Sequence, residues 1–208
     1  MNKQNSIAEK VENIIRTHKF SGAFNDVAIE NYKKKAIYYY NDKNFMDYNF
    51  LTDFHPYFLS DIFKLFYPII PEEQKFEITL RVYSFIQTPT KNLLDIMIDI
   101  KKYRPDENIA PLREFISSDG VITIFRGTPK QENAPQKSLS WTIKENVAAL
   151  YAINIPRTKS GYIYTAKINI DDVIAYITNR YEAEVIQYNS VYNVEKQRVC
   201  IPTNLNYL

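Results

Sequence analysis

The sequence is poor in the residues that most often carry metal, redox or disulfide chemistry, with one cysteine and two histidines among 208 residues. A single cysteine, Cys200, excludes an internal disulfide and a cysteine-based zinc cluster. His18 ends a charged segment and His55 precedes Pro56, and neither belongs to a motif for nucleophilic catalysis. We therefore expect no metal, and we expect Cys200, in an apolar segment near the end of the chain, to be a packed thiol.

Long apolar runs and a strong charge of one sign are also absent. No apolar run approaches the roughly 20 residues of a membrane helix, and the N-terminus lacks the pattern of a signal peptide. The formal net charge is +2, and the densest basic run, Lys33–Lys35, is interpreted as a solvated helix face. These observations predict a protein of the cell interior without a membrane partner. They disfavour nucleic acid, whose partners usually carry a concentrated basic footprint.

The first part of the chain has the hydrophobic period of helices. Ile7, Val11, Ile14 and Ile15 recur at helical spacing, and later segments repeat this pattern with aromatic stripes that we interpret as core. The predicted helices lie at about 58–66, 72–87 and, after a Thr90 cap, 91–98. We predict a helical region at residues 1–115.

After a turn at residues 117–120 the period changes to that of strands. Thr142 and Glu145 fit a capping box at the start of a helix whose inner stripe would be Val147, Leu150 and Tyr151. The predicted strands lie at about 121–126, 161–170, 182–188 and 191–201, with short helices at 142–155 and 171–177. This order predicts an α+β fold class, with a compact α+β region at residues 116–208 behind the helical half.

Two glutamates lie in a strand that is apolar on both faces. Because side chains alternate along a strand, Glu182 and Glu184 should point to the same side. Two neighbouring carboxylates inside a protein repel each other and lose hydration, so they persist where cations, donors or a ligand compensate them. The pair indicates a functional site, and an edge strand with two solvated glutamates is the alternative.

Arg126 shares its side of an earlier strand with Ile122 and Ile124, where a core residue would be expected. An arginine there usually binds a carboxylate or a phosphate, because its planar fork matches their oxygens. Gly127 follows, and without a Cβ it lets a ligand approach the backbone. A structural ion pair is the alternative.

A third segment, Ser138-Leu139-Ser140-Trp141-Thr142, precedes the predicted helix. Its hydroxyl groups are suited to orienting the arginine or the glutamate, although serines before a helix are also common in ordinary loops. Taken alone, this segment does not distinguish the two interpretations.

In this order, an aromatic-Arg-Gly strand end, Ser-Trp-Thr before a helix and Glu-x-Glu-Val-Ile on a late strand resemble the Arg–Ser–Glu class of mono-ADP-ribosyltransferases. This class includes bacterial toxins and phage-encoded enzymes. The resemblance covers roughly 116–188, less than half the chain. It implies a compact split-sheet catalytic half and NAD as the substrate. Because the β-rich part is shorter than in many toxins of this class, we expect the helical half to pack against it and to complete the NAD cleft.

The resemblance also implies roles for single residues. Arg126 would hold the NAD diphosphate or the adjacent ribose, and Gly127 backbone groups would hold the nicotinamide amide. Ser140 would brace the site, with Trp141 and Thr142 completing that NAD-binding segment. Glu184 would be the catalytic carboxylate, and Glu182 would deprotonate or orient the acceptor.

Some details depart from the family pattern or stay open. Family members often have Ser-Thr-Ser where this chain has Ser-Leu-Ser, so either Ser138 or Ser140 could be the motif serine, and we prefer Ser140. Tyr162 or Tyr164 is a candidate for stacking on nicotinamide. The turn before Glu182, including Asn179, Arg180 and Tyr181, is where the family recognises its acceptor.

The resulting functional expectation is transfer of ADP-ribose from NAD to a protein side chain, with arginine favoured, and release of nicotinamide. Such an effector of phage or bacterial type would act in the cytoplasm of its producer or of a host cell. The alternatives are an NAD glycohydrolase, a nucleic-acid ADP-ribosyltransferase, or a non-enzymatic protein-interaction module on the same fold. A glycosidase is disfavoured, because adjacent glutamates lie side by side and do not flank a bond.

Overall fold

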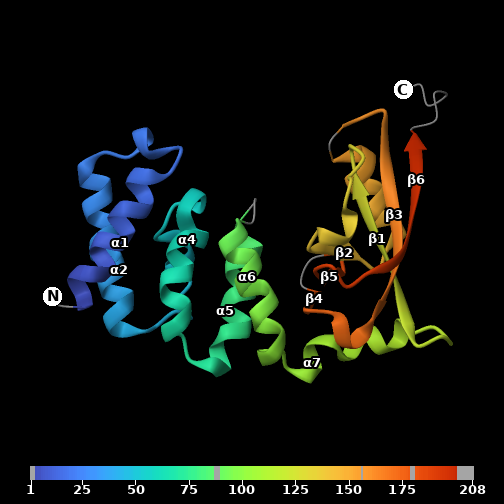
Figure 1. Cartoon of the computed structure of the whole chain (residues 1–208), viewed down its shortest axis with the longest axis horizontal. Helices are drawn as coiled ribbons and strands as arrows, with labels where there is room; N and C mark the ends of the chain where they lie inside the picture. The colour runs from blue at the N-terminus through green and yellow to red at the C-terminus, as the bar shows by residue number, and fades with distance from the viewer. Residues whose placement is uncertain (1–2, 87–89, 156, 179–180, 201–208) are drawn as a thin grey trace. The chain divides into compact units, whose positions relative to one another are not determined.

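The computed structural model describes residues 3–86, 90–155, 157–178 and 181–200, and the chain divides into two compact units, Met1–Tyr103 and Arg104–Leu208 (Figure 1). The sequence places the division at 115/116. The difference consists of α7 (Asp106–Ile109) and η4 (Ala110–Phe115), which supply Ile109 and Leu112 to the core of the second unit. Among the described residues, no helix is long and apolar enough to span a membrane.

The first unit is helical, and local signals explain where its helices begin. The Asn25 side chain accepts a hydrogen bond from the Ala28 N–H, and Thr90 does the same for Leu93. Pro56 occupies the first turn of its helix, where its missing N–H has no intrahelical acceptor. The helical segments are α1 (Lys3–Thr17), η1 (Ser21–Ala23), α2 (Asp26–Asp42), α3 (Asn49–Thr52), α4 (Pro56–Phe66), η2 (Tyr67–Ile69), α5 (Glu72–Phe85), α6 (Lys91–Asp99) and η3 (Ile100–Tyr103).

The core of this unit is largely aromatic, as the sequence predicts. Phe50, Phe58, Phe63 and Phe66 are fully buried, and α4 contributes three of them because its apolar residues recur on one face. In α6 the hydrophobic spacing of the sequence predicts a buried face of Leu93, Leu94, Met97 and Ile98, and this prediction is partly wrong. Leu93 and Met97 are buried together with Ile96, whereas Ile98 is 45% exposed.

The second unit is built on a six-stranded antiparallel sheet with the order β4-β5-β2-β1-β3-β6. β1 pairs with β3 along its whole length, but with β2 only through Phe125 and Thr142. The sheet therefore consists of two three-stranded parts joined at one residue pair, and the two parts separate beyond it. The strands are β1 (Val121–Thr128), β2 (Ser140–Thr142), β3 (Ser160–Asn169), β4 (Ala175–Ile177), β5 (Glu184–Ile186) and β6 (Tyr192–Cys200).

The two faces of this sheet carry separate cores. On one face, Ile122, Ile124 and Trp141 pack with residues of β3, β5, α7 and η4. The other face is covered by α8 (Glu145–Ala149) and the π-helical segment η6 (Leu150–Asn154), whose Ala148 and Ala152 pack with Ile163 and Phe125. The remaining short helices of this unit are η5 (Pro135–Lys137) and η7 (Ile170–Asp172).

Several sequence expectations for this unit are wrong in detail. Thr142 ends a strand and the capping position of α8 is Lys144, so no capping box forms. The predicted helix at 171–177 is only the short η7 followed by β4, and the predicted strand at 182–188 is confined to β5. Cys200 is exposed because it lies on the outermost strand, β6, most of whose residues are exposed.

Candidate active site

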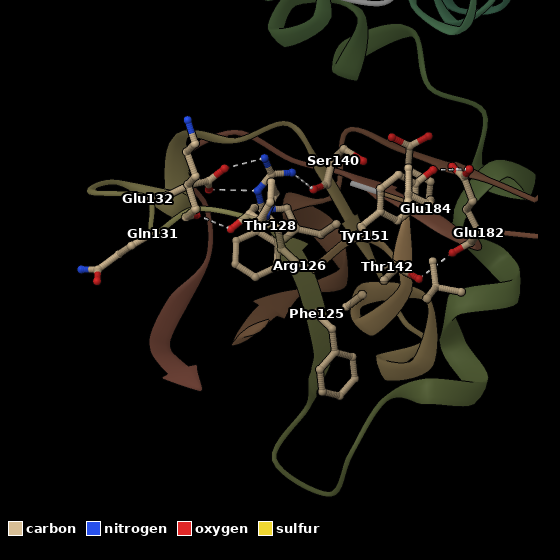
Figure 2. A pocket seen from close by; sticks show the side chains of 17 residues that line it. Phe125, Arg126, Thr128, Gln131, Glu132, Ser140, Thr142, Tyr151, Glu182 and Glu184 are labelled. Atoms are coloured by element: carbon tan, nitrogen blue, oxygen red, sulfur yellow. Dashed lines mark hydrogen bonds and ion pairs between the residues drawn. The ribbon is translucent and has the colours of Figure 1, made fainter. Parts of the chain in front are cut away.

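Arg126 lies near the end of β1, on the side of the sheet that Ile122 and Ile124 also face. Its side chain is 22% exposed, so it is not packed into the core. Nε and Nη2 donate to the two carboxylate oxygens of Glu132 at 3.0 and 2.8 Å, and Nη1 donates to the backbone oxygen of Ser140 at 2.8 Å. Figure 2 shows the guanidinium between these two partners.

These contacts bear directly on the two interpretations of Arg126. A bidentate ion pair with a carboxylate is present, as the structural alternative predicts. The three hydrogen bonds use three of the five N–H donors of a guanidinium. By this count one donor on each Nη atom stays available, and the residue borders a cavity, so it retains the capacity to bind an anion as well.

β2 presents Ser140 and Thr142 on the face opposite to the Trp141 core. Its register with β5 sets Thr142 opposite Glu184, and paired residues share a face. Trp141 is 2% exposed, and its indole N–H donates to the Ser138 backbone oxygen at 3.0 Å. The indole is thus chiefly a core residue, although part of Trp141 reaches the cavity described below.

The structure separates the two candidate serines. Ser140 borders the cavity, and its backbone oxygen accepts the hydrogen bond from Arg126. The Ser138 hydroxyl instead donates to Glu132 Oε2 at 3.2 Å. The positions are consistent with Ser140 as the serine of the site and give Ser138 a supporting contact.

Glu184 is a buried carboxylate, 5% exposed, on a strand between β2 and β4. Glu182 does not continue that strand, because Ala183 has a left-handed backbone conformation with φ +47° that interrupts the alternation. The expected common side of one strand is therefore the wrong description. Glu182 reaches the same cavity from the turn that precedes β5.

Contacts from β2 and η6 hold this turn in place. The Thr142 hydroxyl donates to the Glu182 backbone oxygen at 2.5 Å, and Lys144 Nζ donates to the Tyr181 backbone oxygen at 3.2 Å. The Tyr151 hydroxyl donates to Glu182 Oε1, as Figure 2 shows. The Glu182 carboxylate is consequently positioned by a side chain from the π-helical segment, a type of irregularity that is frequent at functional sites.

All seven residues that the sequence analysis assigns to catalysis or NAD binding border one cavity of about 490 Å³. This volume lies in the usual range for small-molecule sites, roughly 300–1,000 Å³. In Figure 2, Arg126 and Glu132 lie toward one end of the cavity, and Glu182 and Glu184 lie toward the other end. Ser140 lies between these two groups. The lining residues are Phe125, Arg126, Gly127, Thr128, Pro129, Lys130, Gln131, Glu132, Ser140, Trp141, Thr142, Val147, Ala148, Tyr151, Ile155, Glu182 and Glu184.

Gly127 is required by the packing of the protein itself, and the expected approach of a ligand to its backbone stays a prediction. A Cβ at this position would lie 1.6 Å from the backbone oxygen of Ala148, which no side chain tolerates. Gly161 on β3 makes a similar approach to Ala152, where a Cβ would lie 2.2 Å from the backbone oxygen. The glycine therefore admits the backbone of α8 against the sheet, although Gly127 still borders the cavity.

Neither tyrosine that was considered for stacking borders the cavity. Tyr164 is 2% exposed, and its hydroxyl accepts from the Glu132 N–H at 2.7 Å. Tyr162 is partly buried against the core that contains Ile122 and Trp141. The aromatic residues at the cavity are Phe125, Trp141 and Tyr151.

Glu132 and Tyr151 are the site residues that sequence reasoning missed. Glu132 lies in a loop between a strand and a turn, a place where a lone carboxylate is usually solvated. The sequence predicts Tyr151 in the buried stripe of its helix, yet it is 37% exposed, and Ala152 and Ile153 are buried instead. No local pattern distinguishes these two residues from ordinary surface side chains.

The acceptor turn is described only in part. Asn179 and Arg180 lie outside the described residues, and Tyr181 is 98% exposed. Within the described ranges, no group of three or more His, Cys, Asp or Glu side chains is placed to hold a metal ion.

Comparisons with protein-family models, with curated proteins and with solved structures find no match to this chain. A function can therefore be inferred only from the residues of the cavity and from their geometry.

Proposed function

We propose that this protein is an NAD-dependent mono-ADP-ribosyltransferase of the Arg–Ser–Glu class that modifies a protein side chain, with arginine favoured. One observation carries the proposal: Arg126, Ser140 and Glu184, from three separate strands, border a single cavity. The split of the sheet between β1 and β2 supports the related proposal of an ADP-ribosyltransferase-like fold.

The charges at the two ends of the cavity suit the charge distribution of NAD. The diphosphate of NAD is anionic, and Arg126 supplies a cationic fork for it. The nicotinamide ring carries a positive charge that passes to the ribose as the glycosidic bond breaks, and Glu184 supplies a carboxylate there. Because Glu184 is nearly buried, its interaction with that developing charge is weakly screened.

The proposed reaction breaks the bond between C1′ of the ribose and the nicotinamide nitrogen. The bonding electron pair leaves with nicotinamide, which becomes neutral, and C1′ acquires oxocarbenium character. A carboxylate that is fixed near this centre stabilises the transition state more than the ground state, which is the condition for catalysis. The acceptor nitrogen then bonds to C1′ and loses one proton, which passes to a carboxylate or to water.

Glu182 is the second carboxylate of the site, and its position suits the acceptor step. It lies next to the exposed turn at Tyr181, whereas Glu184 lies in the sheet. A base beside an exposed turn can take up the proton of an incoming guanidinium or orient that group by hydrogen bonds. This division of roles between the two carboxylates favours an arginine acceptor over water.

The proposal assigns the chemistry to the α+β unit alone, because every residue that lines the cavity lies between positions 125 and 184. The proposed partner is a target protein in the cytoplasm of the producer or of a host cell, where NAD is present. This setting matches an effector of phage or bacterial type.

The test is incubation of the protein with NAD labelled in its ADP-ribose portion and a cell lysate. We expect label on protein and release of nicotinamide, and we expect Glu184→Gln to lower nicotinamide release by at least about 100-fold. Glu114→Gln is the matched control, because Glu114 is an exposed carboxylate of the same unit away from the cavity.

Each other outcome has a defined meaning. Nicotinamide release without label transfer indicates an NAD glycohydrolase, and label that a nuclease removes indicates a nucleic-acid acceptor. Neither transfer nor nicotinamide release contradicts all the enzymatic proposals and leaves a protein-interaction module. Full activity in Glu184→Gln refutes the assignment of the catalytic carboxylate.

A further inference from the structure

Glu132 is tied to the site by more contacts than a loop carboxylate needs. Its two oxygens bind Nε and Nη2 of Arg126, and Oε2 also accepts from the Ser138 hydroxyl. Its backbone N–H donates to the Tyr164 hydroxyl at 2.7 Å, and that hydroxyl lies 3.3 Å from the Glu132 backbone oxygen, to which it donates. Both the side chain and the backbone of this residue are therefore held.

The anchors of Glu132 come from the sheet and are themselves fixed. Tyr164 is a 2% exposed core residue of β3, directly opposite Arg126 in the β1–β3 register. Ser138 immediately precedes the β2 region, and its backbone oxygen accepts from the Trp141 indole and from the Gln187 side chain. Glu132 is thus bound to residues from both parts of the split sheet, so the fold fixes its position. Its loop neighbours Lys130 and Gln131 are exposed.

We propose that Glu132 is a positioning residue that acts through Arg126, holding one edge of the guanidinium so that Arg126 meets the anionic part of its ligand in a single orientation. The Glu132 carboxylate takes the Nε–Nη2 edge, and the Ser140 backbone oxygen fixes Nη1 from the other side. An arginine without such partners samples many rotamers and loses that freedom on binding. Glu132 removes this entropic cost before the ligand arrives.

The negative charge of Glu132 opposes this benefit, because it also repels a diphosphate. Both side chains of the ion pair are partly exposed, at 22% and 26%, so water screens that repulsion. The loss of side-chain freedom, in contrast, is not reduced by solvent. We therefore expect the positioning effect to exceed the repulsion.

The experiment measures equilibrium binding of NAD by the fluorescence of Trp141, the sole tryptophan of the chain, which borders the cavity. Glu184→Gln is the background, so that NAD is not consumed. We expect Glu132→Ala to weaken NAD binding by about tenfold. Glu114→Ala, an exposed carboxylate away from the cavity, should leave binding unchanged.

A second background separates positioning from a general structural role. If Glu132 acts only through Arg126, then Glu132→Ala should have no further effect on NAD binding when Arg126→Ala is already present. An equal loss in both backgrounds would show that the loop itself is damaged and would overturn the inference. Unchanged or tighter binding in Glu132→Ala would also overturn it, because Glu132 would then be irrelevant or a competitor of the ligand.

This inference rests on the proposed function, and the two fail in distinguishable ways. No binding of NAD to the Glu184→Gln background, together with no nicotinamide release by the unsubstituted protein, refutes both. Binding in that background with no effect of Glu132→Ala refutes the role of Glu132 alone and leaves the enzyme assignment intact.

Discussion

In the helical unit the interior is filled by aromatic rings, and two tyrosine hydroxyls bind partly exposed carboxylates, whereas in the α+β unit polar groups gather around a cavity. The Tyr39 hydroxyl donates to Asp53 at 2.6 Å, and the Tyr67 hydroxyl donates to Asp99 at 2.7 Å. In the second unit Arg126, Glu132, Glu182 and Glu184 all border the same opening. The polar pairs of the helical unit are only partly buried and lie apart from one another in the sequence, whereas the charged side chains of the α+β unit surround one cavity.

The two units also differ in how closely their backbone segments pack at glycine positions. At Gly22, the one glycine in the sequence of the helical unit, there is no close backbone approach, and an added Cβ would meet no atom within 4 Å. The α+β unit brings the backbone of α8 and η6 against two strands at Gly127 and Gly161. The cavity therefore depends on tight backbone packing, while the aromatic core depends on side-chain volume.

The largest expected effect is that of Gly127→Ala. The added Cβ would lie 1.6 Å from the Ala148 backbone oxygen, so α8 must move off the sheet or the strand must deform. We expect a loss of stability of about 4 kcal/mol or more, the exceptional class for one substitution. Denaturation followed by Trp141 fluorescence measures it, and Gly22→Ala is the control. A change below about 1 kcal/mol would refute this account of Gly127.

Phe58→Ala tests the other side of the comparison. Phe58 is fully buried among rings including Phe24 and Tyr32, and its removal leaves a cavity in the helical core. We expect a loss of about 3–5 kcal/mol in the free energy of unfolding of this unit, measured by circular dichroism in urea. Trp141 fluorescence, recorded in parallel, reports whether the α+β unit follows. No shift of the dichroism transition would contradict the aromatic core.

Glu182→Ala should alter function with little change in stability, the reverse of Phe58→Ala. If Glu182 acts on the acceptor, transfer to arginine should fall by about 100-fold, a loss within the usual range for removal of a general base. NAD cleavage should persist. Tyr151→Phe, which removes the hydrogen bond to the same carboxylate, should cause a smaller fall of about fivefold. Equal losses of transfer and cleavage would place Glu182 in the cleavage step instead.

The smallest effect concerns the pH dependence of the helical unit. Burial, and then the hydrogen bond to Asp53, raises the pKa of Tyr39, and burial followed by Asp99 raises the pKa of Tyr67 in the same way. Above about pH 10 the unfolded chain releases these protons and the folded chain keeps them, so stability falls as pH rises.

Each tyrosine contributes a slope of at most about 1.4 kcal/mol per pH unit. Tyr39→Phe should remove one of these contributions, as unfolding in urea between pH 8 and 11 can show. An unchanged slope would mean that the Tyr39 hydroxyl is not protected by the fold.

Much of this arrangement can be predicted from the sequence, since hydrophobic period depends on local spacing. The helices α4, α5 and α6 and the strands β1, β3 and β6 follow from it, and the chemical types of the site residues are given directly by the sequence. The extent of β5 cannot be predicted in this way, because it depends on the left-handed backbone at Ala183, whose carbonyl group bonds to the distant Ile143 N–H. Likewise the Thr142–Glu145 pattern satisfies a capping box, yet pairing with Glu184 keeps Thr142 in a strand.

The sequence alone determined which residues carry charge, where helices and strands alternate, and that a guanidinium, hydroxyls and carboxylates occur in a suggestive order. Only the tertiary structure decided that they meet. Because side chains alternate along β1, Arg126 points to one face of the sheet. The register between β2 and β5 places Ser140 and Glu184 on the other face. They border one cavity because β1 and β2 separate beyond a single residue pair, and such a separation depends on long-range packing that no local pattern encodes.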